Sequence, residues 1–441
     1  MNKIKNIGAI SALTMLIGGC SFIFTGNESS VSISQQQVTK DITYLASDEL
    51  KGRKTFSPEI DVAGEYIAQR FTQLGLEPMA GFDSFKQTFS MYSIKTKDAQ
   101  ITLNNQTIDA SMLTVASSTD AVNWHNTDNV SVSVVAKDGD LRKAIRAANA
   151  KGGDHLFLVN SEQQEMFDRY KGYFDRGLTK SSITNSGTIV VVLSDVTEIS
   201  ALKVNITSEI IEQQLTNIVG VLPGKSKADE FVIYSGHYDH IGVNGEEIYN
   251  GANDNASGTT AVLNLAQYFT ELGTNERSLM FIGFTGEELG LFGSNEFVKH
   301  IEPETIAAMI NIEMIGKPSK FENGNLWMSG AERSNLQELL NANLTDELKI
   351  QTNPYPNFNI FYRSDNASLA KVGIPAHSFS TSQIDVDTDY HKSTDDLASL
   401  DLNNLHKAIE ALAIATTDLT TGEVTPSRIE PLEQQQQGKI Y

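Results

Sequence analysis

From residue 216 onward, short apolar runs typical of buried strands alternate with amphipathic segments typical of helices. We expect strands at residues 218–222, 231–235, 279–284, 307–312, 326–329 and 374–379. We expect helices at residues 259–272, 332–344 and 401–419. This alternation predicts a three-layer α/β/α domain around a mostly parallel, mixed central sheet. Sheets of this kind place functional sites beyond the carboxyl ends of their strands.

Five polar segments follow these runs or their edges, and they carry histidine, aspartate or glutamate. They lie at residues 236–240, 253–255, 286–290, 311–316 and 389–391. Together they offer two histidines and three carboxylates as ligands, with one more glutamate beside a ligand. This is the set of side chains that a two-metal hydrolase needs.

The first two segments contain the candidate ligands His237 and Asp254. Asp239 is expected to accept a hydrogen bond from the second ring nitrogen of His237 and so to fix its tautomer. His240 is a second candidate for the role of His237. Asp254 lies in a loop rich in glycine and asparagine, where it either caps the following helix or bridges two cations with its two oxygens.

The remaining segments supply Glu287, Glu288, Glu313 and His391. Two adjacent acids after a buried strand can divide their roles, because the backbone can turn at a strand end. We assign Glu288 to the metal and Glu287 to general base catalysis, the alternative being a solvated pair at a helix start. Glu313 and His391 complete the expected ligand set.

The composition restricts the partners. A formal net charge of −21 disfavours nucleic acid and anionic membrane surfaces. The N-terminus has a basic start, an apolar run from residue 7 to 19 and small residues before Cys20, which is the only cysteine. This pattern is typical of a secretory signal peptide. It resembles the lipobox of bacterial lipoproteins, which implies a lipid on Cys20 and an envelope location. Ser21 favours the outer membrane, with the protein facing the periplasm or the exterior.

The joint order of these motifs resembles metallopeptidase family twenty-eight, the co-catalytic zinc aminopeptidases. The resemblance covers residues 37–80 and 216–420, and residues 44–53 resemble the family's N-terminal signature. It implies that His237, Asp254, Glu288, Glu313 and His391 bind two zinc ions. It also implies that Asp254 bridges the ions and precedes a cis peptide bond, and that Glu287 is the base. The family usually has aspartate where this chain has Glu313.

The expected organisation follows from these assignments. It comprises a signal peptide at 1–19, a lipidated tether at 20–36, a zinc peptidase domain at 37–90 and 210–420, an inserted β-rich accessory domain at 91–209 and a disordered or loosely docked tail at 421–441. Residues 143–160 resemble part of a protease-associated domain.

These features favour an exopeptidase that removes N-terminal residues from peptides, with Tyr390 either donating to the oxyanion or packing in the core. A carboxypeptidase of the same fold would need Arg333 or Arg363 for the substrate carboxylate. A glutaminyl cyclase would use one zinc ion. A binding protein on an inactive peptidase scaffold is the non-enzyme alternative. The substrate pocket is expected to include Phe358, Phe361 and Tyr362.

Overall fold

The computed structural model describes residues 31–432 and 438–441. The predicted signal peptide and the lipidation site at Cys20 lie outside the described residues. Among the helices that are described, none combines the length and the apolar character needed to cross a bilayer.

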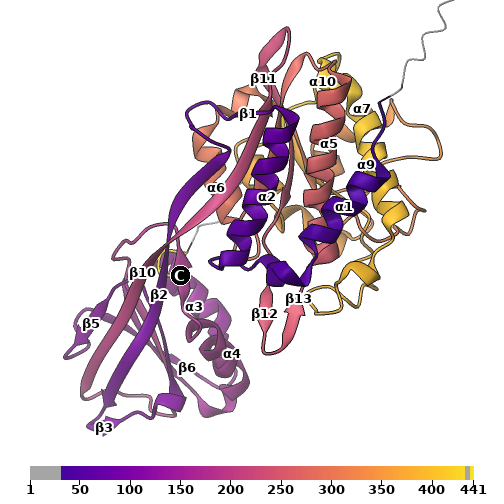
Figure 1. The fold of residues 1–441 in the computed structure, drawn as a ribbon. Coiled ribbons are helices and arrows are strands. Elements are labelled where there is room, and N and C mark those ends of the chain that lie inside the picture. Colours follow the sequence, from indigo (N-terminus) through magenta and orange to yellow (C-terminus); the bar gives the residue numbers. More distant parts are fainter. Residues whose placement is uncertain (1–30, 433–437) are drawn as a thin grey trace, which may run out of the picture. The chain divides into compact units, whose positions relative to one another are not determined.

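The central sheet is mixed and runs in the order β17-β16-β18-β15-β11-β14-β10-β2-β3, with β1, β5 and β8 paired beside this path (Figure 1). Its strands are β1 Glu77–Pro78, β2 Lys86–Leu103, β3 Gln106–Thr107, β5 Ala121–Trp124, β8 Leu178–Lys180, β10 Leu202–Leu222, β11 Lys227–His237, β14 Arg277–Phe284, β15 Ile306–Ile312, β16 Trp327–Met328, β17 Gln351–Thr352 and β18 Ala376–Ser380. The central strands β14, β11, β15 and β18 are parallel to one another. Strand β10 pairs antiparallel with β14.

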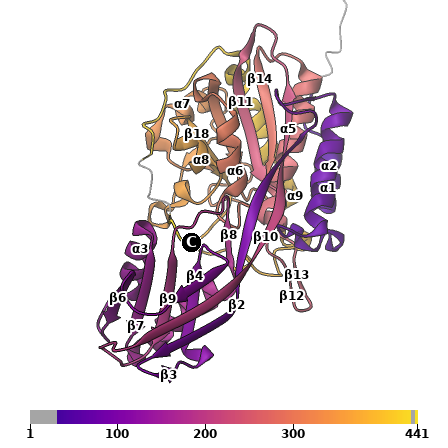
Figure 2. The same ribbon diagram turned by 90° about the vertical axis from the view of Figure 1, so that its left-hand side faces the viewer.

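Helices cover both faces of this sheet, so the predicted three-layer α/β/α fold is confirmed. Figure 2 shows α1, α2 and α5 on one side and α6 and α8 on the other. The helices are α1 Gln35–Leu45, α2 Pro58–Leu74, α5 Gly258–Leu272, α6 Phe292–Phe297, α7 Leu336–Asn341, α8 Asn366–Ala370, α9 Leu402–Ala415 and α10 Thr417–Thr421.

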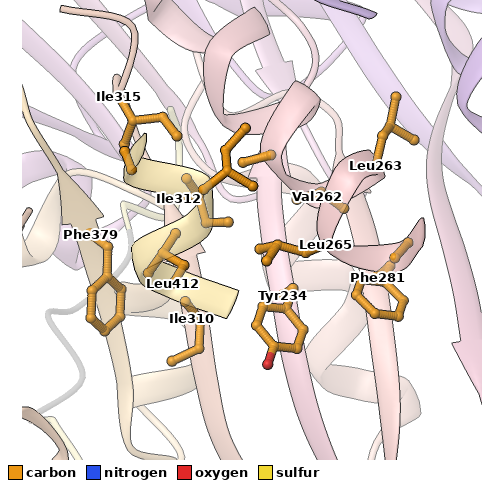
Figure 3. Packing of buried hydrophobic residues seen from close by; sticks show 14 of the residues in the cluster. Tyr234, Val262, Leu263, Leu265, Phe281, Ile310, Ile312, Ile315, Phe379 and Leu412 are labelled. Carbon is orange, nitrogen blue, oxygen red and sulfur yellow. The ribbon is translucent and has the colours of Figure 1, made fainter. Parts of the chain in front are cut away.

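The larger core lies between the sheet and the layer that contains α5 and α9. In Figure 3, Leu265 of α5 and Leu412 of α9 lie over side chains from the strands. Tyr234 of β11 stacks on Phe281 of β14, with ring centroids 5.4 Å apart. The Tyr234 hydroxyl group donates to Thr416 Oγ1 at 2.7 Å, which satisfies the one polar atom of this buried side chain.

Two predicted elements are shorter than expected. The predicted helix at 332–344 is reduced to α7, because the side chain of Asn341 bonds to the backbone of Ile350 at its end. The predicted helix at 401–419 is divided into α9 and α10 at Thr416, whose hydroxyl group donates back to Leu412 O at 2.8 Å.

A second sheet of four strands lies within residues 113–193, in the order β4-β9-β7-β6. Its strands are β4 Leu113–Ser117, β6 Val130–Val135, β7 Asp154–Val159 and β9 Thr188–Leu193. One apolar cluster joins this sheet to α3 Leu141–Lys151 and α4 Gln164–Phe174. Another joins it to β5 and to parts of β2 and β10.

The expected domain boundaries at residues 90 and 210 both fall inside continuous strands. Strand β2 has 18 residues and β10 has 21, and the two pair along their length from Lys86–Ile218 to Leu103–Leu202. They therefore belong to the central sheet at one end and pack against the four-stranded sheet at the other.

The described residues of the tail are docked, which differs from the expected disorder. Ile429 and Ile440 are buried, and Arg428 donates a hydrogen bond to Ile306 O at 2.8 Å. These two isoleucines place apolar side chains in cores, which stabilises the ordered state of the segment.

Candidate metal centre

The predicted ligands meet because three parallel strands end at the same edge of the sheet. His237 is the last residue of β11 and lies opposite Phe284, the last residue of β14. Ser235 pairs with Asn311 of β15, so Glu313 follows its pairing partner by two residues just as His237 does. The parallel register therefore brings His237 and Glu313 together.

Asp254 reaches the same point from the segment Ala252–Ser257, directly before α5. The peptide bond between Asp254 and Asn255 is cis, as the family resemblance implied. The amide group of Asn255 donates to Ile312 O at 2.9 Å and accepts from Met314 N at 3.1 Å. A Cβ atom on Gly258 would clash with Ile312 O, so glycine permits this close approach of α5 to the end of β15.

Two groups of potential ligands share Asp254. The first consists of His237, Asp254 and Glu313, and the second of His240, Asp254 and Glu288, with the ligand atoms of each group within 4.8 Å of one another. His237 Nε2 lies 3.3 Å from both Asp254 Oδ1 and Glu313 Oε1. The other oxygen of Asp254 faces the second group, so a single carboxylate contributes to both groups of potential ligands.

The second group contains His240, which the sequence analysis named only as an alternative to His237. His240 Nδ1 is 2.8 Å from Glu288 Oε1 and 4.0 Å from Asp254 Oδ2. The predicted ligand His391 is equally close, with Nε2 3.2 Å from Asp254 Oδ2 and 3.3 Å from Glu288 Oε2. Both histidines thus face the same pair of carboxylates, and His240 adds a candidate to the five predicted ligands.

The chemistry of these side chains fits zinc. Imidazole nitrogen and carboxylate oxygen are its usual ligands besides thiolate. Glu288 Oε1 and His240 Nδ1 are buried and contact only each other, at 2.8 Å and without regular hydrogen-bond geometry, and His240 Nε2 is buried with no hydrogen-bond partner among the described residues. Buried polar atoms without partners are costly, and a cation between them would remove that cost.

The charges of the metal-free protein show how strongly these groups interact. Burial alone would lower the pKa of His391, but hydrogen bonds to Asp254 and Glu288 raise it to about 10. Burial alone would raise the pKa of Asp254, but hydrogen bonds from His237 and His391 hold it below its usual value. Positive charge is therefore strongly favoured between these carboxylates.

Glu287 follows β14 and lines the same cavity as the ligand groups. Burial raises the pKa of its carboxyl group well above the usual value, against the opposing effect of His237, and the nearby carboxylate of Asp365 adds to the rise. A carboxyl group with a raised pKa is suited to exchange protons near neutral pH.

Asp239 does not make the predicted hydrogen bond to His237. The ring atom His237 Nδ1 lies 3.0 Å from the backbone oxygen of Asp239 and 3.7 Å from its carboxylate. The carboxylate accepts instead from the backbone amides of Glu287 and Glu288, at 3.2 and 3.3 Å. Asp239 therefore holds the backbone of Glu287 and Glu288 in place, and its backbone oxygen orients the imidazole ring of His237.

Tyr390 lies at the cavity rather than in the core, because its side chain is 39% exposed and lines the same space. Its ring stacks on His391 with centroids 4.0 Å apart. Arg363 donates a hydrogen bond to its hydroxyl oxygen at 3.2 Å. Of the residues expected in the substrate pocket, Phe358 lines the cavity, whereas Phe361 and Tyr362 do not.

Sequence reasoning missed three supporting groups. Asp395 accepts hydrogen bonds from the amides of Asn253 and Asp254, at 2.9 and 3.0 Å. Ser364 donates to Glu313 Oε2 at 2.8 Å. The Asp365 side chain is fully buried beside it, and neither carboxylate oxygen has a hydrogen-bond partner in the described parts of the chain. The only sequence signal for Asp395 was its position four residues after His391.

The family model that matches the sequence agrees with the names of similar proteins. Residues 217–416 match the model of peptidase family M28. Aminopeptidase YwaD of Bacillus subtilis is 32% identical over 108 residues, which are 24% of this chain and 22% of that relative. The matched region thus spans less than a quarter of the relative's length.

Solved structures agree in fold. An aminopeptidase from Aneurinibacillus sp. strain AM-1 has a TM-score of 0.55 at 18% identity, over 91% of this chain and 97% of that one. BSAP, a zinc aminopeptidase from Bacillus subtilis, has a TM-score of 0.54 at 15% identity, over 93% and 100%. Residues 217–416, which contain all five predicted ligands, are therefore similar to peptidase family M28.

Proposed function

We propose that the protein is a zinc-dependent aminopeptidase that removes residues from the N-termini of peptides. The observation that supports this most directly is the position of Asp254 between two groups of potential ligands, with the buried carboxyl group of Glu287 on the same cavity. Proteins named aminopeptidase are among its relatives in sequence and in fold.

Each side chain then has a defined task. Zinc held by the two groups would polarise the scissile carbonyl group and lower the pKa of the attacking water. Glu287 takes a proton from that water and passes it to the leaving amine. Because Tyr390 accepts its hydrogen bond from Arg363, its own proton remains free to donate to the developing oxyanion. The free α-amine of the substrate would lie near Glu287 or Glu313.

A carboxypeptidase is the second candidate, because one of the two predicted cations lines the cavity. Arg363 does so, whereas Arg333 stacks over Phe361, 4.4 Å from the ring centroid, and is not part of the lining. An N-acetylated peptide with a free carboxylate would be cleaved by a carboxypeptidase and not by an aminopeptidase. A glutaminyl cyclase with one zinc ion would leave one ligand group unused, and a binding protein would have no need of Glu287.

The central experiment is Glu287→Gln. We expect zinc content to stay at two ions per chain and turnover of aminoacyl anilides to fall by about 10²–10⁴-fold, the range for loss of a general base. Glu304→Gln, an exposed change of the same chemistry, is the control and should have no effect. Turnover near the wild-type rate in Glu287→Gln would contradict the assignment.

We also propose that the mature protein is anchored to the outer membrane by a lipid on Cys20. The support is the sequence pattern alone. The Cys20→Ser variant should move from the membrane fraction to the soluble fraction of fractionated cells. If the wild-type protein is itself recovered as soluble, the anchor does not exist.

A further inference from the structure

The cavity that contains the ligand groups is also lined by apolar side chains. Its volume is about 280 Å³, near the lower end of small-ligand pockets at roughly 300 Å³. Besides the potential ligands, its lining includes the apolar residues Met314, Trp327, Phe358, Ile360 and Ile384. Trp327 is held in place because its indole nitrogen donates to Ser382 O at 3.0 Å. Besides the ligand groups, the cavity therefore has apolar walls on which a substrate side chain can pack.

A buried carboxylate that is not one of the potential ligands also lines this cavity. Asp387 lines the cavity, and its side chain is only 4% exposed. Its Oδ1 accepts from Lys317 Nζ at 2.9 Å and from Asp389 N at 3.0 Å. Its Oδ2 has no hydrogen-bond partner in the described ranges, and the same is true of Ser382 Oγ, which belongs to the same lining. Two buried polar atoms, each in a residue that lines the cavity, therefore lack a donor or acceptor, which is unfavourable unless a ligand supplies one.

The charge of Lys317 does not cancel this carboxylate. Its ammonium group is also 2.8 Å from the carboxylate of Asp389. One positive charge thus pairs with two negative charges, and Lys317, Asp387 and Asp389 together keep a net charge of −1. Lys317 is not part of the cavity lining, whereas Asp387 is. The negative member of this trio is thus the one at the cavity.

Arg363 is the one arginine or lysine in the lining among the described residues, and its positive charge opposes the negative charge of Asp387. Its side chain is exposed and is engaged with Tyr390. The exposed charge is screened by water, whereas the buried charge of Asp387 acts in a medium of lower dielectric constant. Asp387 therefore has the larger effect on a group inside the cavity.

We propose that this cavity receives the first side chain of the peptide and selects lysine or arginine through Asp387. The inference rests on the proposed aminopeptidase function. The aliphatic stem of a lysine or arginine would pack on Trp327 and Ile384, and its cation would donate to Asp387 Oδ2 and Ser382 Oγ. Such a contact gives a charge-assisted hydrogen bond to Asp387 Oδ2, the carboxylate oxygen that has no other partner in the described ranges.

The test compares lysyl and norleucyl p-nitroanilides, since norleucine has the same stem without the ammonium group. We expect kcat/KM of the wild-type enzyme to favour the lysyl substrate at least 10-fold, and Asp387→Asn to reduce that ratio at least 10-fold. The norleucyl rate is an internal reference, because loss of folding lowers both rates equally. Asp385→Asn removes a charge from an exposed residue of the same loop, outside the lining, and should keep the wild-type ratio.

The outcomes separate the two proposals. Hydrolysis of none of the lysyl, arginyl, norleucyl and glutamyl anilides by the zinc-loaded enzyme would overturn the proposed function itself. Hydrolysis that favours norleucyl or glutamyl substrates over lysyl and arginyl ones would overturn the selectivity alone. An unchanged ratio in an active Asp387→Asn variant would also overturn it. A smaller fall in the ratio in Ser382→Ala, which keeps the carboxylate, would support the second contact.

Discussion

The guanidinium group of Arg53 donates a hydrogen bond of 2.7 Å to the backbone oxygen of Asn250, across 197 residues of chain. The same side chain donates to Tyr238 O at 2.8 Å and to Gly251 O at 3.0 Å. It is completely buried and so connects the loop after His237 with the loop before Asp254. Burial lowers its pKa to about 10, although the site carboxylates oppose that change. Arg53 thus fixes the distance between two ligand-bearing loops.

Arg53→Lys should weaken zinc binding without removing the positive charge. A lysine has three donors on a flexible stem and cannot reproduce the planar fork of arginine. Each buried carbonyl left without a donor costs about 1–3 kcal/mol, and loss of supporting contacts around ligands typically weakens metal binding about 10–100-fold. Competition with a chromophoric chelator would measure the affinity, and urea unfolding of the zinc-free protein the stability. Arg142→Lys, at an exposed position, is the control. Equal zinc affinity in Arg53→Lys and in the wild type would show that the two ligand-bearing loops keep their spacing without the guanidinium group of Arg53.

His237, Glu288 and Glu313 could be predicted from sequence because each one ends or follows a buried strand. In a sheet of parallel strands, an apolar run that ends in histidine or glutamate indicates the strand that carries this side chain and the edge of the sheet at which it lies. Asp239 shows the limit of this reasoning. Spacing placed it next to His237, but the chain turns after β11, so its carboxylate contacts the amides of Glu287 and Glu288 instead. Such a contact depends on the path of a second loop.

The path of β2 and β10 was also beyond prediction. Their middle sections pair with each other between two separate cores. They are rich in polar residues, among them Glu209, Glu212 and Gln213, because these positions pack against neither core. Apolar periodicity is weak there, so the sequence indicated short runs and an insertion with boundaries in loops. Continuous pairing over these sections is a tertiary feature that only the partner strand reveals.

Glu313→Asp should weaken one zinc ion and spare the other. Glu313 spans two partners, because Oε1 lies 3.3 Å from His237 Nε2 and Oε2 accepts from Ser364 Oγ. Aspartate is shorter by one methylene and cannot keep both contacts from the same backbone position. We expect a stepwise zinc titration to show about 10-fold weaker binding of a single ion, at the low end of supporting-contact effects. Equal weakening of both ions, or of neither, would show that this carboxylate is not specific to one group. Glu304→Asp is the matched exposed control.

His377 should make the zinc-free protein less stable as the pH falls from about 6.5 to 4. Its side chain is fully buried, with Nδ1 2.8 Å from Ser329 O and Nε2 2.8 Å from Ser334 Oγ. Burial lowers its pKa to about 4, against the smaller opposing effect of the Ser329 carbonyl group. The unfolded chain therefore takes up a proton near pH 6.5 while the folded protein does not. The stabilisation is complete above pH 6.5 and declines toward pH 4, by about 3 kcal/mol in total.

The variant His377→Gln isolates this contribution, because it cannot titrate. Urea unfolding at a series of pH values should show a shallower decline for the variant than for the wild type between pH 6.5 and 4. Other titrating groups are common to both proteins and cancel in the difference. Parallel curves over this range would mean that His377 is protonated equally in the folded and unfolded states.

Asn149 should control how firmly the C-terminal residues hold the accessory sheet. Its Oδ1 accepts from the amides of Ile440 and Tyr441 at 2.8 and 3.0 Å, and its Nδ2 donates to Tyr441 O at 2.8 Å. Asn149→Ala leaves the two amides without their acceptor, at a cost of about 1–3 kcal/mol for a buried group. Ile440, which is fully buried in the core formed with α3 and α4, should then open more often. Hydrogen exchange should become faster in α3, α4 and β9, while zinc content stays the same because Asn149 has no contact with the ligands. Asn126→Ala, at an exposed turn, provides the control. Unchanged exchange in Asn149→Ala would mean that the buried isoleucine alone holds this segment.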